Sequence, residues 1–266
     1  MHKGGFSSVG ERVFTCDALT ETGLVRHGFS TKRGGVSSGK FASLNLGIYT
    51  ADAPEMIEQN FSLFCQDIQV NRKSLVFSKQ VHSTVVRCVT EEDAGLLPQE
   101  YPQCDGLVTN RPGVALATFC ADCTPILLLD PVKRVVASIH SGWRGTLGQI
   151  VCRGVEVMKS RFGCVPGNIL VAMGPSLKQC HFEVDSDVYH LFVEKFGDAA
   201  QRNTRQTGEK YYIDTDALNV HSLMSCGVLR ENIFVCPLCT HCGEETFFSY
   251  RRDGETGRMC GVIELI

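Results

Sequence analysis

Two apolar runs joined by a short turn sequence constrain the fold of this chain more than any other feature. The runs cover residues 126–129 and 135–139, and residues 130–133 between them read DPVK. Asp and Pro favour tight turns, and short runs of Leu, Val and Ile are typical of strands. The segment therefore predicts an antiparallel β-hairpin. With the turn centred on DPVK, Asp130 faces Arg134 and Thr124 lies opposite His140, to within a residue or two.

The same kind of apolar run recurs along the chain and predicts further strands. Turn or polar residues bound each run, as expected for strands that cross a core. The additional runs are residues 75–77, 85–89, 114–119, 169–172 and 233–235.

Helical periodicity is clearest after the hairpin. Apolar and small residues recur there at spacings of three and four, which places them on one face of a helix that Gly163 ends. The residues of this face are Leu147, Ile150, Val151, Gly154, Val155, Met158 and Phe162. Weaker helical patterns cover residues 54–66, 185–196 and 216–226.

The order of these elements predicts the fold class. Strands and helices are mixed without the regular alternation of a doubly wound sheet, so we expect a mixed α/β fold. Its core should be β-sandwich-like, with mixed sheets flanked by helices. No repeat, low-complexity tract or linker divides the chain, so a single domain over residues 1–266 is expected. Residues 91–104 are typical of a polar surface loop.

Charge and composition limit the classes of partner. The formal net charge is −3 and the Lys and Arg residues form no basic stripe, which argues against nucleic-acid and membrane partners. A small-molecule substrate is expected, with the chain a monomer or small homo-oligomer. No apolar run approaches the roughly 18 residues of a membrane span, and residues 1–14 have no signal-peptide core. We therefore expect a cytoplasmic protein whose fourteen cysteines stay reduced, most of them as small buried residues.

The predicted hairpin brings two metal-binding side chains together. Cys123 and His140 lie at its open end, and thiolate and imidazole are good ligands for zinc. His82, in the sequence KQVHS, is the candidate third ligand because a loop position lets its side chain reach a distant hairpin. Three protein ligands leave one coordination position open, which is the pattern of a catalytic site.

Two other interpretations use the same residues. In the first, His82 and His140 are hydrogen-bonded histidines and Cys123 is a packing residue. In the second, Cys123 is a nucleophile that His140 activates. His82 discriminates between the second interpretation and a metal site, because a Cys/His pair has no obvious use for another histidine.

Eight ordered motifs resemble those of the laccase-domain (polyphenol oxidase) family. The resemblance covers nearly the whole chain and implies that His82, Cys123 and His140 are the metal ligands. It also implies a fold similar to the catalytic domain of cytotoxic necrotising factor toxins. The motifs are residues 27–35 (HGFSTKRGG), 43–47 (SLNLG), 79–82 (KQVH), 105–109 (DGLVT), 121–125 (ADCTP), 140–145 (HSGWRG), 174–176 (GPS) and 247–254 (FFSYRRDG) followed by 256–258 (TGR).

The resemblance implies one of two activities. The first is zinc-dependent phosphorolysis of adenosine, inosine, guanosine and methylthioadenosine to base and ribose 1-phosphate, with adenosine deamination. The second is copper-dependent oxidation of polyphenols. A multicopper laccase needs many histidines, typically in His-x-His pairs, whereas this chain has eight histidines and no such pair. The nucleoside reaction with Zn²⁺ is therefore favoured over a Cu²⁺ oxidase, and a non-catalytic, metal-stabilised binding module is the second alternative.

Residues near the predicted ligands are candidates for catalysis. Asp122, beside the ligand Cys123, is expected to orient a histidine ligand or to act as a base. Trp143 is expected either to stack on a purine or to wedge the turn against the helix that follows.

Cationic and amide side chains in the motifs are candidates for substrate binding. Arg144 and Lys79 are the cations closest in sequence to the histidine ligands, and Arg26 and Arg33 lie in or beside the first motif. Each is a candidate for holding phosphate. Asn45 is a candidate for binding ribose hydroxyls or the base edge.

A second metal site is an open alternative. Four candidate ligands lie within seven residues, although such tight spacing makes it awkward for all four to reach one ion. These residues are Cys236, Cys239, His241 and Cys242.

Overall fold

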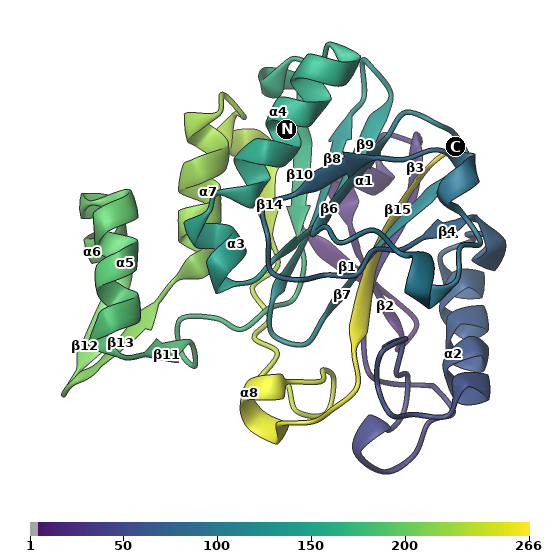
Figure 1. Cartoon of the computed structure of the whole chain (residues 1–266), viewed down its shortest axis with the longest axis horizontal. Coiled ribbons are helices and arrows are strands. Elements are labelled where there is room, and N and C mark those ends of the chain that lie inside the picture. The colour runs from purple at the N-terminus through teal and green to yellow at the C-terminus, as the bar shows by residue number, and fades with distance from the viewer. Residues whose placement is uncertain (1–4) are drawn as a thin grey trace.

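The computed structural model describes residues 5–266, and two six-stranded sheets form its centre (Figure 1). The expectation about a signal peptide in residues 1–14 falls partly on residues 1–4, outside the described residues. No helix in residues 5–266 is both long and apolar enough to cross a membrane.

The first sheet combines strands from widely separated parts of the chain. In spatial order they are β1 (Phe6–Val9), β2 (Val13–Cys16), β3 (Val25–Ser30), β15 (Met259–Leu265), β7 (Ala115–Cys120) and β4 (Leu75–Val76). The pair β4 and β7 is parallel, and the other neighbours are antiparallel. The sheet is therefore mixed, as predicted.

The second sheet has the predicted hairpin at its centre. Its strands, in spatial order, are β14 (Ile233–Val235), β10 (Leu170–Met173), β8 (Thr124–Asp130), β9 (Val135–Ser141), β6 (Gly106–Thr109) and β5 (Val86–Cys88). The outer pairs β10/β14 and β5/β6 are parallel, whereas the inner pairs are antiparallel.

The two sheets pack face to face around an apolar core. Leu127 and Leu129 of β8 belong to the cluster between the sheets, which also contains Leu116 of β7. The alternate residues Ile126 and Leu128 belong to a second cluster, under the helices. Because both faces of β8 are covered, all of its residues are buried, and residues 125–129 form a continuous apolar run rather than an alternating one.

Helices cover both outer faces of the sandwich. The helices α4 (Ile150–Phe162) and α7 (Thr215–Ser225) pack on the second sheet, and α2 (Pro54–Asp67) packs on the first (Figure 1). These positions confirm the predicted sandwich flanked by helices. The predicted helices at residues 54–66 and 216–226 correspond to α2 and α7 within one residue at each end.

A smaller unit lies beside the sandwich (Figure 1). Its helix α5 (Ser186–Phe196) matches the prediction for residues 185–196. The unit also contains α6 (Asp198–Arg202) and a three-stranded sheet of β11 (Glu183–Val184), β13 (Lys210–Ile213) and β12 (Thr204–Thr207). Its core residues pack against Trp143 and Leu147.

The remaining helical elements are short. The predicted polar loop at residues 91–104 contains two of them, η3 and η4, and is largely exposed, as expected. The short elements are α1 (Asp17–Thr20), α3 (Trp143–Leu147), α8 (Tyr250–Asp253), η1 (Gly39–Phe41), η2 (Arg72–Ser74), η3 (Glu91–Asp93), η4 (Pro98–Glu100), η5 (Pro166–Asn168) and η6 (Arg230–Asn232).

The hairpin register differs by one residue from the prediction. Asp130 pairs with Val135 rather than Arg134, and Thr124 pairs with Ser141 rather than His140. The Asp130 carboxylate accepts the backbone N–H groups of residues 132 and 133, and residue 134 has a φ of 52°. The turn therefore needs one more residue than a turn centred on DPVK.

The helix predicted from Leu147 is two helices. α3 ends at Leu147 and α4 begins at Ile150, because Gln149 takes a left-handed conformation with a φ of 56°. Gly148 lies so close to the Thr84 side chain that a Cβ would clash. The prediction that Gly163 ends the helix is confirmed, with a φ of 68°.

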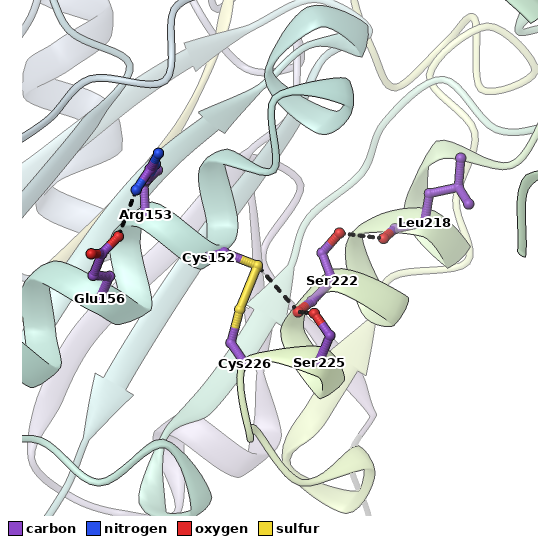
Figure 2. The surroundings of a disulfide bond; sticks show 7 residues. All are labelled: Cys152, Arg153, Glu156, Leu218, Ser222, Ser225 and Cys226. Carbon is purple, nitrogen blue, oxygen red and sulfur yellow. Dashed lines mark hydrogen bonds and ion pairs between the residues drawn. A yellow bond between two sulfur atoms is a disulfide. The ribbon is translucent and has the colours of Figure 1, made fainter. Parts of the chain in front are cut away.

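A disulfide joins Cys152 of α4 to Cys226, which follows α7 (Figure 2). The expectation that all cysteines stay reduced is therefore wrong for this pair. The two residues are 74 positions apart in sequence, but packing of α4 on α7 brings their Cα atoms to 6.0 Å, within the range of a disulfide. Most of the unpaired cysteines are buried, as expected.

Loss of this disulfide is expected to destabilise the protein. Cys152→Ser opens a cross-linked loop of 74 residues, so the free energy of unfolding should fall by roughly 2–4 kcal/mol. Urea denaturation of Cys152→Ser and Cys226→Ser should give the same loss, and Cys88→Ser, which removes an unpaired cysteine, is the control. Unfolding midpoints equal to that of the wild type in both variants would show that the cross-link contributes nothing.

His27 on β3 is expected to control stability at acid pH. Its ring is 4% exposed, its Nε2 accepts the Cys16 N–H at 2.9 Å, and burial lowers its pKa to about 4. Between pH 6.5 and 4 the His27 ring is protonated in the unfolded chain but stays neutral in the folded protein. Stability should therefore fall as pH falls, by about 3 kcal/mol in total. Urea denaturation at pH 7.5 and 4.5 should show a smaller decrease in the free energy of unfolding for His27→Gln than for the wild type. Equal decreases in the two proteins would contradict a role of His27 in acid stability.

Candidate metal centre and its pocket

The three predicted ligands converge at one end of the second sheet. His140 lies in β9, Cys123 immediately precedes β8, and His82 lies in the loop between β4 and β5. Their donor atoms lie within 4.8 Å of one another, with Sγ of Cys123 3.8 Å from Nε2 of His82. A sulfur and a nitrogen bound tetrahedrally to one zinc ion would be about 3.6 Å apart. The donor set therefore fits a zinc-sized ion.

The backbone at the hairpin end allows this approach. Pro125 pairs with His140 across the hairpin, so Cys123 lies two residues beyond that pair. Gly142 follows on the other strand, where a Cβ would lie 2.7 Å from Cδ2 of His82 and 3.0 Å from the Cys123 sulfur. Only glycine leaves space for both ligands at this position.

Asp105 holds two of the ligands in place. The Nδ1 atom of His140 donates to Oδ1 of Asp105 at 2.9 Å, and the backbone N–H of His82 donates to the same oxygen at 3.0 Å. Oδ2 accepts the N–H groups of Val81 and Ser83 and the Ser83 hydroxyl. The carboxylate therefore directs Nε2 of His140 toward the centre and fixes the loop that carries His82.

Asp122 does not orient a histidine ligand, which was one of the two roles predicted for it. The ring of His140 contacts Asp105 instead. The motif at residues 105–109 contains this aspartate, but nothing in the sequence pairs it with His140. The pairing arises because β6 lies beside β9.

Charge coupling favours the ionised form of the thiol. Burial raises the pKa of Cys123, but the positive charge of His140 and hydrogen bonds from both histidines lower it to about 6. For His140, burial lowers the pKa, whereas Cys123 and Asp105 raise it to about 9. Burial likewise raises the pKa of Asp105, and hydrogen bonds from His140 and Ser83 bring it to about 2. A thiolate at neutral pH is the form that binds a metal.

A pocket of about 460 Å³ opens beside the three ligands. This volume lies within the range of cavities that bind small molecules. Two arginines, Arg251 and Arg258, contribute positive charge to its wall. Its aromatic lining consists of Tyr49, Phe119, Trp143, Phe182 and Tyr250.

Asp122 lies in the pocket wall with both carboxylate oxygens engaged. Oδ1 accepts the Thr240 hydroxyl at 2.6 Å, and Oδ2 accepts the Arg251 backbone N–H at 2.6 Å. Because each oxygen has two lone pairs, both can still accept a hydrogen bond from a ligand.

Asn45 lies outside the pocket, in contrast to its predicted contact with substrate. Its side chain is fully buried, and Oδ1 accepts the backbone N–H groups of Gly47 and Arg258, each at 2.9 Å. Both of these residues line the pocket. Asn45 therefore positions the wall rather than forming it.

The predicted phosphate-binding cations also lie away from the lining. Neither Arg26, Lys79, Arg33 nor Arg144 is among the described residues that line the pocket. Arg26 lies 3.7 Å from Glu264, the Arg33 side chain donates to the Glu245 carbonyl, and the Arg144 guanidinium lies 4.1 Å from the ring centre of Trp143.

The arginines that do line the pocket were missed by reasoning from sequence proximity. Arg251 and Arg258 both lie in the last motif, more than 100 residues after the ligands. The Arg251 guanidinium donates to the carbonyls of His181 and Glu183, each at 3.0 Å. Membership in a motif was the only available signal for either residue.

The four residues predicted as a second set of ligands do not form one group. Cys239 and Cys242 do lie together, but their neighbours are Cys180 and His181. Cys236 is fully buried and outside this group, and the ring of His241 stacks on that of His181 with centroids 3.8 Å apart.

Comparison with known proteins places the chain in a family. Residues 26–266 match the family described as multi-copper polyphenol oxidoreductase laccase. Purine nucleoside phosphorylase YlmD of Geobacillus stearothermophilus is 35% identical over 93% of this chain and 92% of that protein. Purine nucleoside phosphorylase YfiH of Escherichia coli is 37% identical over 89% of this chain and 92% of that protein.

Solved structures agree with this placement. The crystal structure of YlmD from Geobacillus stearothermophilus matches with a TM-score of 0.93 and 33% identity, covering 98% of this chain and 99% of that chain. Because the structural match covers nearly the full length of both chains, it includes the sheets and the helices around them. This chain therefore belongs to the polyphenol oxidoreductase laccase family, whose relatives include proteins named purine nucleoside phosphorylase.

Proposed function

We propose that this chain is a metal-dependent purine nucleoside phosphorylase that holds a zinc ion with His82, Cys123 and His140. Adenosine, inosine, guanosine and methylthioadenosine are the proposed substrates, and base and ribose 1-phosphate the products. The observation that carries the proposal is the position of the three donors, which converge beside a pocket with aromatic and arginine residues. The names of the relatives support the same reaction.

The pocket residues divide the work of phosphorolysis. A phosphate oxygen forms a bond to C1′ of the ribose while the bond from C1′ to the purine nitrogen breaks, so positive charge develops at the sugar. Arg251 and Arg258 hold the phosphate, and aromatic side chains such as Trp143 stack on the purine. Asp122 accepts a hydrogen bond from a ribose hydroxyl or transfers a proton to the departing base. A bound zinc ion would supply Lewis acidity toward a substrate oxygen or nitrogen.

A copper-dependent phenol oxidase is the second candidate, favoured by the family description and by the Cys/His/His donor set. Reduction of oxygen to water takes four electrons, and one such centre supplies one at a time. The only other group of potential metal ligands in residues 5–266 contains three sulfurs and one imidazole. That group is unlike the histidine-rich cluster at which a laccase reduces oxygen.

Product analysis with adenosine tests the proposal. Protein of known metal content is incubated with adenosine, with and without phosphate, and the products are separated by liquid chromatography, with Cys123→Ala as the blank. Adenine and ribose 1-phosphate that form only with phosphate would support phosphorolysis, and inosine in either condition would show deamination. If the zinc-loaded protein forms neither, the proposal fails, and copper-loaded protein with a diphenol under oxygen becomes the next assay.

A further inference from the structure

Four metal-binding side chains form a second cluster, separate from the centre at His82. Cys180, His181, Cys239 and Cys242 place their donor atoms within 4.8 Å of one another. The first two residues follow β10, and the last two follow β14. The cluster therefore joins two loops that are far apart in sequence.

The donor separations agree with a tetrahedral zinc site. The Cys180 sulfur lies 3.6 Å from that of Cys239 and 3.7 Å from that of Cys242. Zn–S bonds of about 2.3 Å at the tetrahedral angle place two sulfurs about 3.8 Å apart.

The imidazole completes the same arrangement. Nδ1 of His181 lies 3.2, 3.4 and 4.0 Å from the sulfurs of Cys180, Cys242 and Cys239, respectively. The separation expected around zinc is about 3.6 Å. The average of the three distances is close to this value, and all four donor atoms lie within 4.8 Å of one another, so the spacing is compatible with one shared ion.

The backbone around Cys239 supports this geometry. Cys239 and Cys242 have the C-x₂-C spacing of a zinc knuckle. A bridge between Ser176 and Cys239 aligns the two loops, with Thr240 N–H donating to the Ser176 carbonyl. The His241 ring stacks on His181 at 14° and fixes the ring plane.

We propose that Cys180, His181, Cys239 and Cys242 bind a structural Zn²⁺ ion. Four protein ligands close the coordination shell, so this site has no open position for substrate. It is distinct from the three-ligand centre and is independent of the activity proposed for that centre.

The ion would stabilise one wall of the pocket. Phe182, next to the ligand His181, lines the pocket, and the hydroxyl of Thr240, next to Cys239, donates to Asp122. Arg251 donates to the carbonyl of His181. Cross-linking the two loops therefore holds an aromatic side chain, a carboxylate and an arginine in one arrangement.

A disulfide is the competing use of these sulfurs. Two of the three cysteines would have to approach to about 2.05 Å. Such a bond would leave the third sulfur and the imidazole without a role, whereas zinc uses all four donors.

Metal analysis and cobalt spectroscopy test the proposal on the full-length protein. Wild-type protein purified without chelator should contain about two zinc ions per chain, and Cys123→Ala and Cys242→Ser about one each. Cys88→Ser should keep both ions and controls for the loss of a cysteine. Because Cys123→Ala keeps all four proposed ligands, its Co²⁺ form should show intense tetrahedral d–d bands and thiolate charge-transfer bands, which Cys123→Ala/Cys242→Ser should lose.

Three results would overturn the proposal. The first is a wild-type protein that contains one metal ion per chain, which Cys123→Ala removes. The second is a Co²⁺-treated Cys123→Ala protein whose spectrum has no thiolate charge-transfer bands. The third is a disulfide between Cys180 and either Cys239 or Cys242 in the purified protein. None of these measurements involves nucleoside turnover, so failure here is distinguishable from failure of the phosphorylase proposal.

Discussion

Cys123→Ala is expected to lower kcat/KM for adenosine phosphorolysis by at least about 10³-fold. The substitution removes the anionic ligand of the proposed centre and leaves two imidazoles, of which His140 is held by Asp105. The zinc content should fall by one ion per chain in the same preparation. Steady-state kinetics and metal analysis measure the two effects together.

Cys88→Ser is the matched control, because Cys88 is an unpaired cysteine on β5 outside both clusters. It should keep wild-type activity and metal content. Full turnover by metal-depleted Cys123→Ala would contradict the metal-dependent mechanism. Loss of turnover with all metal retained would instead favour the interpretation of Cys123 as a nucleophile.

Asp105→Asn is expected to weaken metal binding by about 10–100-fold. An amide has one acceptor oxygen, whereas the carboxylate accepts hydrogen bonds at both oxygens, from His140 and His82 at one and from Val81 and Ser83 at the other. The amide NH₂ must therefore face N–H donors that are partly buried. With at least two donors unsatisfied, at about 1–3 kcal/mol each, the free energy of unfolding should fall by roughly 2–6 kcal/mol.

Competition with a chromogenic chelator measures the metal affinity, and urea denaturation of the metal-free protein measures the stability. Asp187→Asn, an exposed position in the first turn of α5, is the control and should change neither. Wild-type affinity in Asp105→Asn would mean that the orientation of His140 and the His82 loop does not limit binding.

Several of the strands predicted from sequence are covered on both faces, although the predicted β5 is partly exposed and the fully buried β15 was missed. The runs around Leu116, Leu127 and Val136 are continuous because each strand lies between the opposite sheet and a layer of helices. β3 was missed because its buried residues include His27 and Gly28, which do not form an apolar run. The strands of the third sheet are short, and Ile213 is their only buried residue, so no apolar pattern marks them.

In the candidate site, too, some residues could be predicted from the sequence and others could not. Counting along one hairpin predicted that Cys123 and His140 lie together, because a hairpin is local and an error of one residue is tolerable. Residues that come together only because several elements pack on one another could not be paired by counting along the sequence. Arg144, adjacent in sequence to the site, stacks on Trp143, whereas Arg251 and Arg258 reach the pocket from the C-terminal loops.

The position of β15 has a consequence for synthesis of the protein. β15 lies between β3 and β7, with backbone hydrogen bonds to both, although it follows both in sequence. While the ribosome is still translating the intervening residues, β3 and β7 each expose an edge that has no partner. The first sheet can therefore close only after translation has reached residues 259–265. Until then, those two unpaired edges are sites at which a nascent chain can pair with another chain and aggregate.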